Sequence, residues 1–136
     1  MSKRSGLMIG ELARIAGVTP EAIRYYEREH VIPIARRDGS GKYRRYDSGD
    51  ADRLRFVRHA RDLGFSLEDV RGLLLLAGSD PGRPCGDVDQ IARAHLAQVD
   101  AKLAQLTALR AELSRLTAGC DANASIGECS LLSALK

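Results

Sequence analysis

The residues of this chain that are best suited to chemistry are three cysteines, Cys85, Cys120 and Cys129. Thiolates bind soft metal ions, and they also form disulfides or act as redox switches. Cys85 precedes a long segment without proline or glycine, residues 87–118, and the other two cysteines follow it. Which thiols can meet therefore depends on the structure of that segment.

Apolar residues recur along 87–118 in steps of three and four, which predicts one continuous helix with an apolar stripe. With a rise of about 1.5 Å per residue this helix is roughly 48 Å long, so Cys85 and Cys120 of one chain lie at opposite ends. We expect the stripe to form a dimer interface. Its central residues are Leu96, Val99, Leu103, Leu106, Leu109 and Leu113.

Antiparallel packing of two such helices brings the start of one to the end of the other. Cys85 of one chain then approaches the partner's Cys120 and the partner's Cys129, and two-fold symmetry generates two equivalent three-thiolate metal sites. Buried structural cysteines and a Cys120–Cys129 disulfide are the alternatives. They are disfavoured because the cysteines lie in glycine-containing segments without a core stripe, and because a chain without a secretory segment is expected in the reducing cytoplasm.

Three thiolates suit soft divalent ions, namely Hg(II), Pb(II) and Cd(II), the last of which can add an oxygen or nitrogen ligand. Zinc normally takes four ligands and fits less well. His95 could be a fourth ligand, but a histidine on a helix is more often a packing or surface residue. A soft divalent metal ion is therefore the expected effector.

Charge is divided unevenly along the chain. Residues 1–62 contain 14 Lys and Arg and 9 Asp and Glu, a net charge of +5, whereas residues 63–136 contain 7 and 9, a net charge of −2. Five of the ten residues 36–45 are Arg or Lys, and two glycines and Tyr43 separate them. This composition predicts a basic β hairpin, or wing, that follows a phosphate backbone.

Two short helices are expected before this hairpin. Apolar residues in 8–16 have helical spacing, Gly17 interrupts them, and Thr19 can cap a second helix with Pro20 at its first position. This pattern indicates a helix-turn-helix whose second helix, 20–29, reads DNA, although Tyr25 or Tyr26 could instead be core. The expected DNA contacts are Thr19, Arg24, Tyr25, Tyr26, Arg36, Arg37, Lys42, Tyr43, Arg44, Arg58 and His59.

Further helices are expected from Asp47 or Ser48 to about Leu63, and from Ser66 onward. The predicted fold is all-α with a small β wing. It comprises a winged helix-turn-helix DNA-binding domain (1–77), a linker loop with the first metal ligand (78–86), a long antiparallel coiled-coil dimerisation helix (87–118), and a metal-binding loop with a short C-terminal helix (119–136). No apolar segment is long enough to span a membrane, and no grouping of Ser, His and Asp suggests an enzyme.

Three segments carry a family resemblance: IGELARIAGVTPEAIRYYE, GKYRRY and LRFVRHARDLGFSLEDVRGLL, in that order before a long helix. Over essentially its whole length the chain resembles the MerR family of transcriptional regulators. CGDVDQIARAHLAQV and GCDANASIGECSLLSAL are similar to the branch that senses divalent heavy metals, in which a cysteine before the dimer helix joins two from the partner. Two departures are His30, where relatives usually have glycine, and a segment 30–46 about one residue longer than usual.

The resemblance implies a mechanism of activation by distortion. Members of the family bind, as homodimers, promoters whose two polymerase-recognition elements are too far apart for RNA polymerase. Metal binding changes the dimer so that it bends and untwists the DNA, which aligns the elements and activates heavy-metal resistance genes. The alternative is a thiol-based redox-sensing regulator of the same fold. A purely architectural DNA-binding protein would leave the cysteines without a role.

Overall fold

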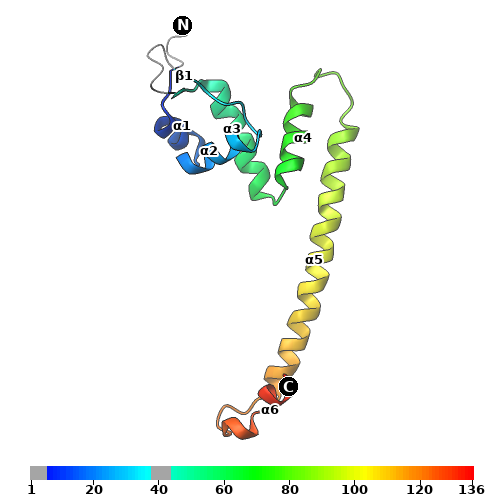
Figure 1. Ribbon diagram of the computed structural model, residues 1–136. Helices are drawn as coiled ribbons and strands as arrows, with labels where there is room; N and C mark the ends of the chain where they lie inside the picture. Colours follow the sequence, from blue (N-terminus) through cyan, green and yellow to red (C-terminus); the bar gives the residue numbers. More distant parts are fainter. Residues whose placement is uncertain (1–5, 38–43) are drawn as a thin grey trace. The chain divides into compact units, whose positions relative to one another are not determined.

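The structure is a computed structural model that describes residues 6–37 and 44–136, and it is mostly helical. The chain folds as two compact units, Met1–Ile91 and Ala92–Lys136 (Figure 1). Among the residues described, no helix combines the length and the apolarity needed to cross a membrane.

The described part of the first unit contains four complete helices and the start of a fifth. Hydroxyl and carboxylate side chains begin three of them: the Thr19 hydroxyl accepts from Ala22 N at 3.0 Å, Asp47 accepts from Asp50 N at 2.9 Å, and Ser66 caps the next helix in the same way. The helices are α1 (Ile9–Ala16), α2 (Pro20–Arg28), α3 (Ser48–Asp62), α4 (Leu67–Ala77) and α5 (Gly86–Ala118).

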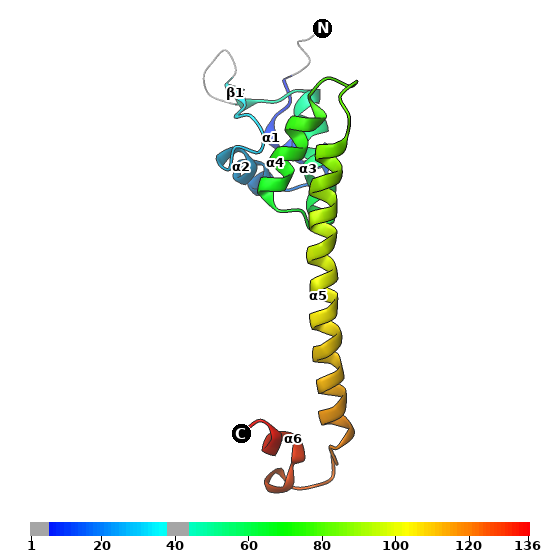
Figure 2. The same cartoon turned by 90° about the vertical axis from the view of Figure 1, so that its right-hand side faces the viewer.

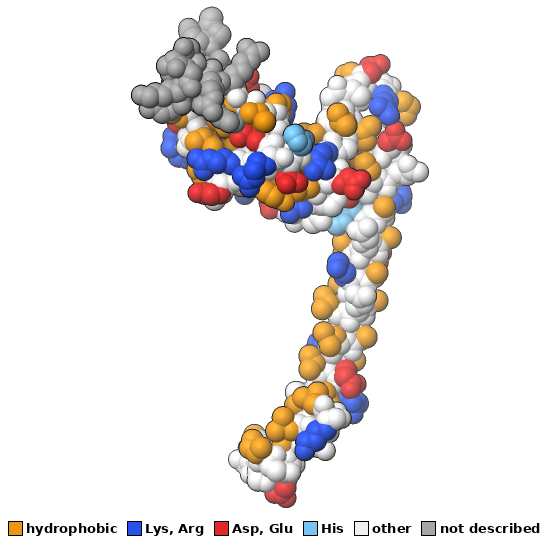
Figure 3. Space-filling view, viewed as in Figure 1, with side chains coloured by type: hydrophobic (Ala, Val, Ile, Leu, Met, Phe, Trp, Pro, Cys, Tyr) orange, Lys and Arg blue, Asp and Glu red, His pale blue; other side chains and the backbone are white. Residues whose placement is uncertain are grey.

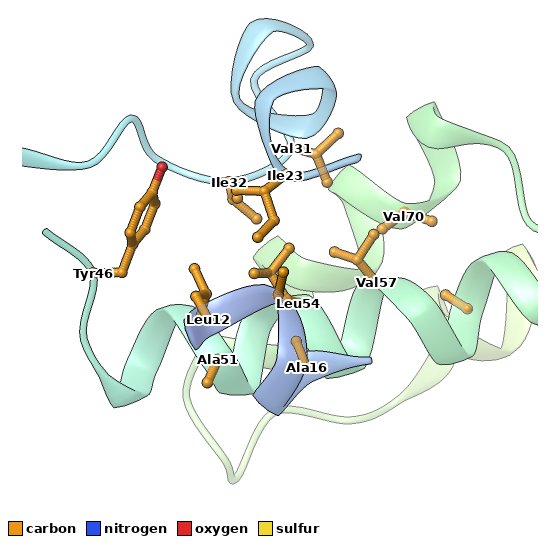
Figure 4. Close-up of a cluster of buried hydrophobic side chains, with 12 residues drawn as sticks. Leu12, Ala16, Ile23, Val31, Ile32, Tyr46, Ala51, Leu54, Val57 and Val70 are labelled. Carbon is orange, nitrogen blue, oxygen red and sulfur yellow. The ribbon is translucent and has the colours of Figure 1, made fainter. Parts of the chain in front are cut away.

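The core of the first unit lies between α1, α2, α3 and α4. Figure 4 shows Leu12 of α1 beside Leu54 of α3, and Val57 of α3 facing Val70 of α4. These four side chains are fully buried. Ile23 of α2 is also fully buried and belongs to the same cluster. Phe56 of α3 is half-buried.

Two short strands connect α2 to α3. β1 (Arg36–Arg37) pairs antiparallel with β2 (Arg44–Arg45), with Arg36 opposite Arg45. We call these four residues the β1–β2 ribbon. Directly after it, Tyr46 exchanges two backbone hydrogen bonds of 2.9 Å with Leu7, so the ribbon is tied to the segment that precedes α1.

Two turns of this unit use the left-handed backbone region. Gly17, between α1 and α2, has a φ of 74°, and His30, just after α2, has a φ of 59°. At the position where the resemblance leads us to expect glycine, this chain thus holds a residue with a Cβ in a left-handed conformation. Histidine tolerates that conformation better than most residues, but the conformation still costs free energy.

We therefore expect His30→Gly to raise the free energy of unfolding by about 0.5–1 kcal/mol, because relief of about 1–2 kcal/mol of backbone strain exceeds the added freedom of glycine in the unfolded chain. Urea unfolding at one fixed protein concentration measures the change as a higher midpoint with an unaltered slope.

Gly17→Ala is the matched opposite change. A methyl group there would meet Arg58 Nη1 at 2.9 Å in addition to the unfavourable φ, so this variant should lower the midpoint. A His30→Gly midpoint equal to that of the parent chain would show that His30 is unstrained.

The second unit contains most of α5, the short 3-10 helix η2 (Ile126–Glu128) and α6 (Ser130–Ala134). α5 is continuous over 33 residues and begins one residue before the predicted helix. Apolar side chains are exposed along it (Figure 3). Figure 2 shows the chain leaving the end of α5 in a loop that turns into α6.

Candidate DNA interface and candidate metal ligands

The outer side of α2 carries the polar and aromatic residues that we expected to contact DNA. Arg24 and Tyr25 are exposed, and the Arg28 guanidinium lies 5.9 Å from the centre of the Tyr25 ring. Ile23 and Glu27, one helical turn apart, occupy the opposite, buried side. Several Lys and Arg side chains are visible on the part of the first unit that carries α2 (Figure 3). This helix thus presents one cationic, aromatic face to solvent.

Tyr26 differs from its neighbour. It is half-buried and packs against the core, and its ring centre lies 5.6 Å from that of Tyr25. Thr19, at the start of α2, uses its hydroxyl to cap the helix. The structure therefore gives Tyr26 and Thr19 structural contacts within the first unit.

Arg58 and His59 lie on α3 and are exposed. The Arg58 guanidinium passes beside Gly17, in the turn of the helix-turn-helix, and its Nε lies 3.9 Å from a carboxylate oxygen of Asp62. An exposed ion pair of this length contributes little to stability, so Arg58 can exchange Asp62 for another anion at small cost.

The ribbon supplies four arginines, of which Arg45 differs from the rest. Its Nη1 donates to the Gly6 carbonyl at 2.9 Å, which ties β2 to the start of the described chain. Arg36, Arg37 and Arg44 lie on the paired strands. Lys42 and Tyr43, also expected at DNA, lie outside the described residues.

Two features of α2 and the residue that follows it were not foreseen from the sequence. Glu27 is only 4% exposed, and Arg71 of α4 donates its Nε–H to the carbonyl of Glu29 at 2.9 Å. A signal for the first was present, because Glu27 falls four residues after Ile23 and so on the same side of the helix. The sequence had no comparable signal for Arg71, since that contact joins residues 42 apart.

Cys85 lies in the loop before α5 and is exposed. The Cys85 carbonyl accepts a hydrogen bond from Asp89 N at 2.9 Å. The side chains of Arg83 and Asp87, which flank Cys85 in the sequence, form an ion pair of 2.6 Å. The thiol borders a depression of about 190 Å³ whose walls include Leu76 and Val88. Backbone contacts with the first turn of α5 thus hold this cysteine, while its sulfur is accessible.

Cys120 and Cys129 bracket the loop between α5 and α6. The Cys129 Sγ caps α6 by accepting from Leu132 N at 3.5 Å. The Ser130 hydroxyl donates to the Gly119 carbonyl at 2.8 Å. Gly119 directly precedes Cys120, and Ser130 directly follows Cys129. This hydrogen bond therefore joins the two ends of the loop, and both cysteines lie next to the residues that it connects.

All three cysteines are free thiols. They divide between the units, with Cys85 in the first and the other two in the second. Among the described residues of a single chain, no three metal-ligating side chains come together. His95 is half-buried on α5 and already has an interaction partner. Thiolate sulfur is a soft ligand, so three thiolates together favour the binding of soft metal ions.

Charged side chains flank the exposed apolar residues of α5. Near its C-terminal end, the hydrogen bond from Arg115 lowers the pKa of the Glu112 carboxyl. The apolar stripe itself consists of Leu96, Val99, Leu103, Leu106, Leu109 and Leu113, which are 38–61% exposed. Such a continuous apolar strip on a helix is typical of an interface.

Comparisons with known proteins agree on one family. Residues 7–76 match the model of the MerR HTH family regulatory proteins, and residues 51–116 match that of the MerR DNA-binding region. The chain is 41% identical over 129 residues to the HTH-type transcriptional regulator ZntR of Escherichia coli K12, covering 94% of this chain and 91% of that protein. It is 36% identical over 130 residues to the mercuric resistance operon regulatory protein of Serratia marcescens, covering 96% and 88%.

A solved structure gives the same result. The transcription regulator PbrR691 from Ralstonia metallidurans CH34, in complex with lead(II), superposes with a TM-score of 0.84 and 37% identity, over 96% of this chain and 99% of that one. These relatives are transcription regulators and not enzymes. With a helix-turn-helix of the same type, a matching family model over half of its length and relatives that align along nearly all of it, the chain belongs to the MerR family of DNA-binding transcription regulators.

Proposed function

We propose that this protein is a cytoplasmic, metal-responsive transcriptional regulator. As a homodimer it binds promoter DNA, and it activates heavy-metal resistance genes by distorting that DNA for RNA polymerase when a soft divalent ion binds three cysteines. The observation that carries the proposal is the placement of free thiols at the two ends of an exposed apolar helix: Cys85 before α5, and Cys120 and Cys129 after it.

The exposed stripe of α5 supports the dimer. Fully burying one leucine or valine contributes about 1.5–3 kcal/mol, so a second copy that covered these six residues would remove a large apolar surface from water. Antiparallel pairing as a coiled coil places Cys85 of one chain beside the partner's Cys120 and the partner's Cys129, and so completes two sites.

The donor set supports the choice of metal. Three thiolates suit Hg(II), Pb(II) and Cd(II), whereas Zn(II) would need a fourth ligand. Similarity to a lead-bound regulator and to a mercuric resistance regulator points the same way, and similarity to ZntR retains zinc as the less favoured ion.

For the DNA-binding unit, residues 1–77, we propose a winged helix-turn-helix. α2 enters the major groove with Arg24, Tyr25 and Tyr26, while the β1–β2 ribbon is the wing and lies along the phosphates. Thr19, Arg58 and His59 add contacts beside the turn, and residues 78–86 link this unit to α5.

Titration of the reduced, purified protein with Hg(II), Pb(II), Cd(II), Zn(II) and Cu(I) tests the metal assignment. We expect thiolate-to-metal charge-transfer absorption that saturates at one soft divalent ion per subunit. Transcription from the operator-bearing promoter should rise over the same range. If peroxide in metal-free buffer activated transcription and the metal ions did not, the thiol redox alternative would replace this proposal.

A further inference from the structure

Glu27 is the one buried charged residue of the core region that the structure describes. A glutamate is almost never buried unless its carboxylate is paired. Its Oε2 accepts two hydrogen bonds, one from the Ala35 backbone N–H and one from the Tyr46 hydroxyl, each 3.1 Å long. Both donors come from segments outside α2, so the carboxylate joins the recognition helix to its surroundings.

The two donors have a specific location. Ala35 directly precedes β1, and Tyr46 directly follows β2. A single oxygen atom therefore holds both ends of the β1–β2 ribbon against α2. The Tyr46 ring is 2% exposed and lies at the edge of the core, on the segment that leads into α3 (Figure 4).

The ribbon needs such an anchor. Its strands are two residues long, and an isolated two-stranded hairpin is marginally stable at best. The Ala35 N–H also requires an acceptor, because it is partly removed from water. Glu27 meets both requirements from the buried side of the helix whose exposed side carries Arg24 and Tyr25.

We propose that Glu27 is a positioning residue for DNA recognition. It fixes the ribbon relative to α2, so that the arginines of the ribbon and the outer face of α2 engage one duplex at the same time. This inference rests on the proposed contact between the ribbon and phosphates. Glu27 itself does not touch DNA in this arrangement.

The test measures operator affinity of the full-length dimer as a function of salt. Each lost phosphate contact reduces the magnitude of the slope of log K against log salt by about 0.9. Glu27→Met should weaken operator binding about 10- to 100-fold and reduce the magnitude of that slope by about 2, because the ribbon arginines lose their register with the backbone.

Two further variants separate positioning from bulk stability. Glu27→Gln should bind within about threefold of the parent chain, since an amide oxygen can accept from both donors. Tyr46→Phe removes one donor, keeps the buried ring and should weaken binding about 2- to 10-fold with a smaller change in slope. If Glu27→Met does not fold, Tyr46→Phe decides the test.

Glu21→Met is the matched control. It makes the same substitution on the exposed first turn of α2, and loss of a negative charge near DNA should leave affinity equal or raise it. A loss in Glu21→Met equal to that in Glu27→Met would overturn the inference.

Arg37→Ala and Arg44→Ala separate failure of this inference from failure of the proposed ribbon contact. If both leave the salt slope unchanged, the ribbon does not touch phosphates, and both ideas are overturned. If both arginine variants reduce the magnitude of the salt slope but Glu27→Met and Tyr46→Phe do not, the ribbon does contact phosphates. The positioning role of Glu27 is then refuted.

Discussion

A heterodimer assembled from one Cys85→Ser chain and one Cys120→Ser chain should bind one metal ion tightly. In the proposed shared site, Cys85 of each chain meets the partner's Cys120 and the partner's Cys129. The heterodimer then has one site that lacks two thiols and one site that is complete. Both homodimeric variants should lose metal affinity by about a hundredfold or more, because thiolate bonds supply most of the binding free energy.

Stoichiometry after competition with a chelator measures this result, and the charge-transfer band reports the thiolates. Both homodimers should still occupy the operator, since Cys85 and Cys120 lie outside α1 to α4. If all three ligands came from one chain, each site of the heterodimer would lack a thiol. A stoichiometry of zero would thus refute the shared antiparallel site.

Leu106→Glu should convert the protein to monomers. Leu106 is 61% exposed on α5, and the proposed dimer buries it twice, so the variant introduces two unpaired carboxylates into an apolar interface. The penalty for each buried charge is several kcal/mol, which corresponds to an increase of about 1000-fold or more in the dimer dissociation constant. Operator affinity should fall with it, because a monomer contacts half a site.

Sedimentation velocity with and without operator DNA measures the assembly state. Gln105→Glu adds the same charge one residue away from the stripe and should remain dimeric. An intact Leu106→Glu dimer would contradict the assignment of this helix face as the interface.

The helices of the first unit could be predicted because their signals are local. Thr19, Asp47 and Ser66 cap helices, and Gly17 ends one, through contacts within four residues. A sequence displays such contacts directly. The long helix was equally predictable, and its first residue differs by one position.

The contacts of Glu27 could not be predicted in the same way. Its partners lie 8 and 19 residues away, and only the folded connection around the ribbon brings them to one oxygen. The candidate metal ligands pose a different difficulty. The sequence suggests that a second chain supplies the other ligands of the Cys85 site, and the fold of one chain does not include them.

The hydrogen bond between Ser130 and Gly119 has a consequence for the order of metal capture. Closing a flexible loop of about ten residues costs about 2 kcal/mol in chain entropy, and here a protein hydrogen bond holds the loop closed before any ion arrives. If the three cysteines are the ligands as proposed, Cys120 and Cys129 form one pair within a subunit, and Cys85 of the other subunit forms the last bond. In the proposed dimer, two cysteines of one chain would bind the ion first. Only the bond to the third sulfur, from Cys85 of the other chain, would then connect the two subunits through the metal.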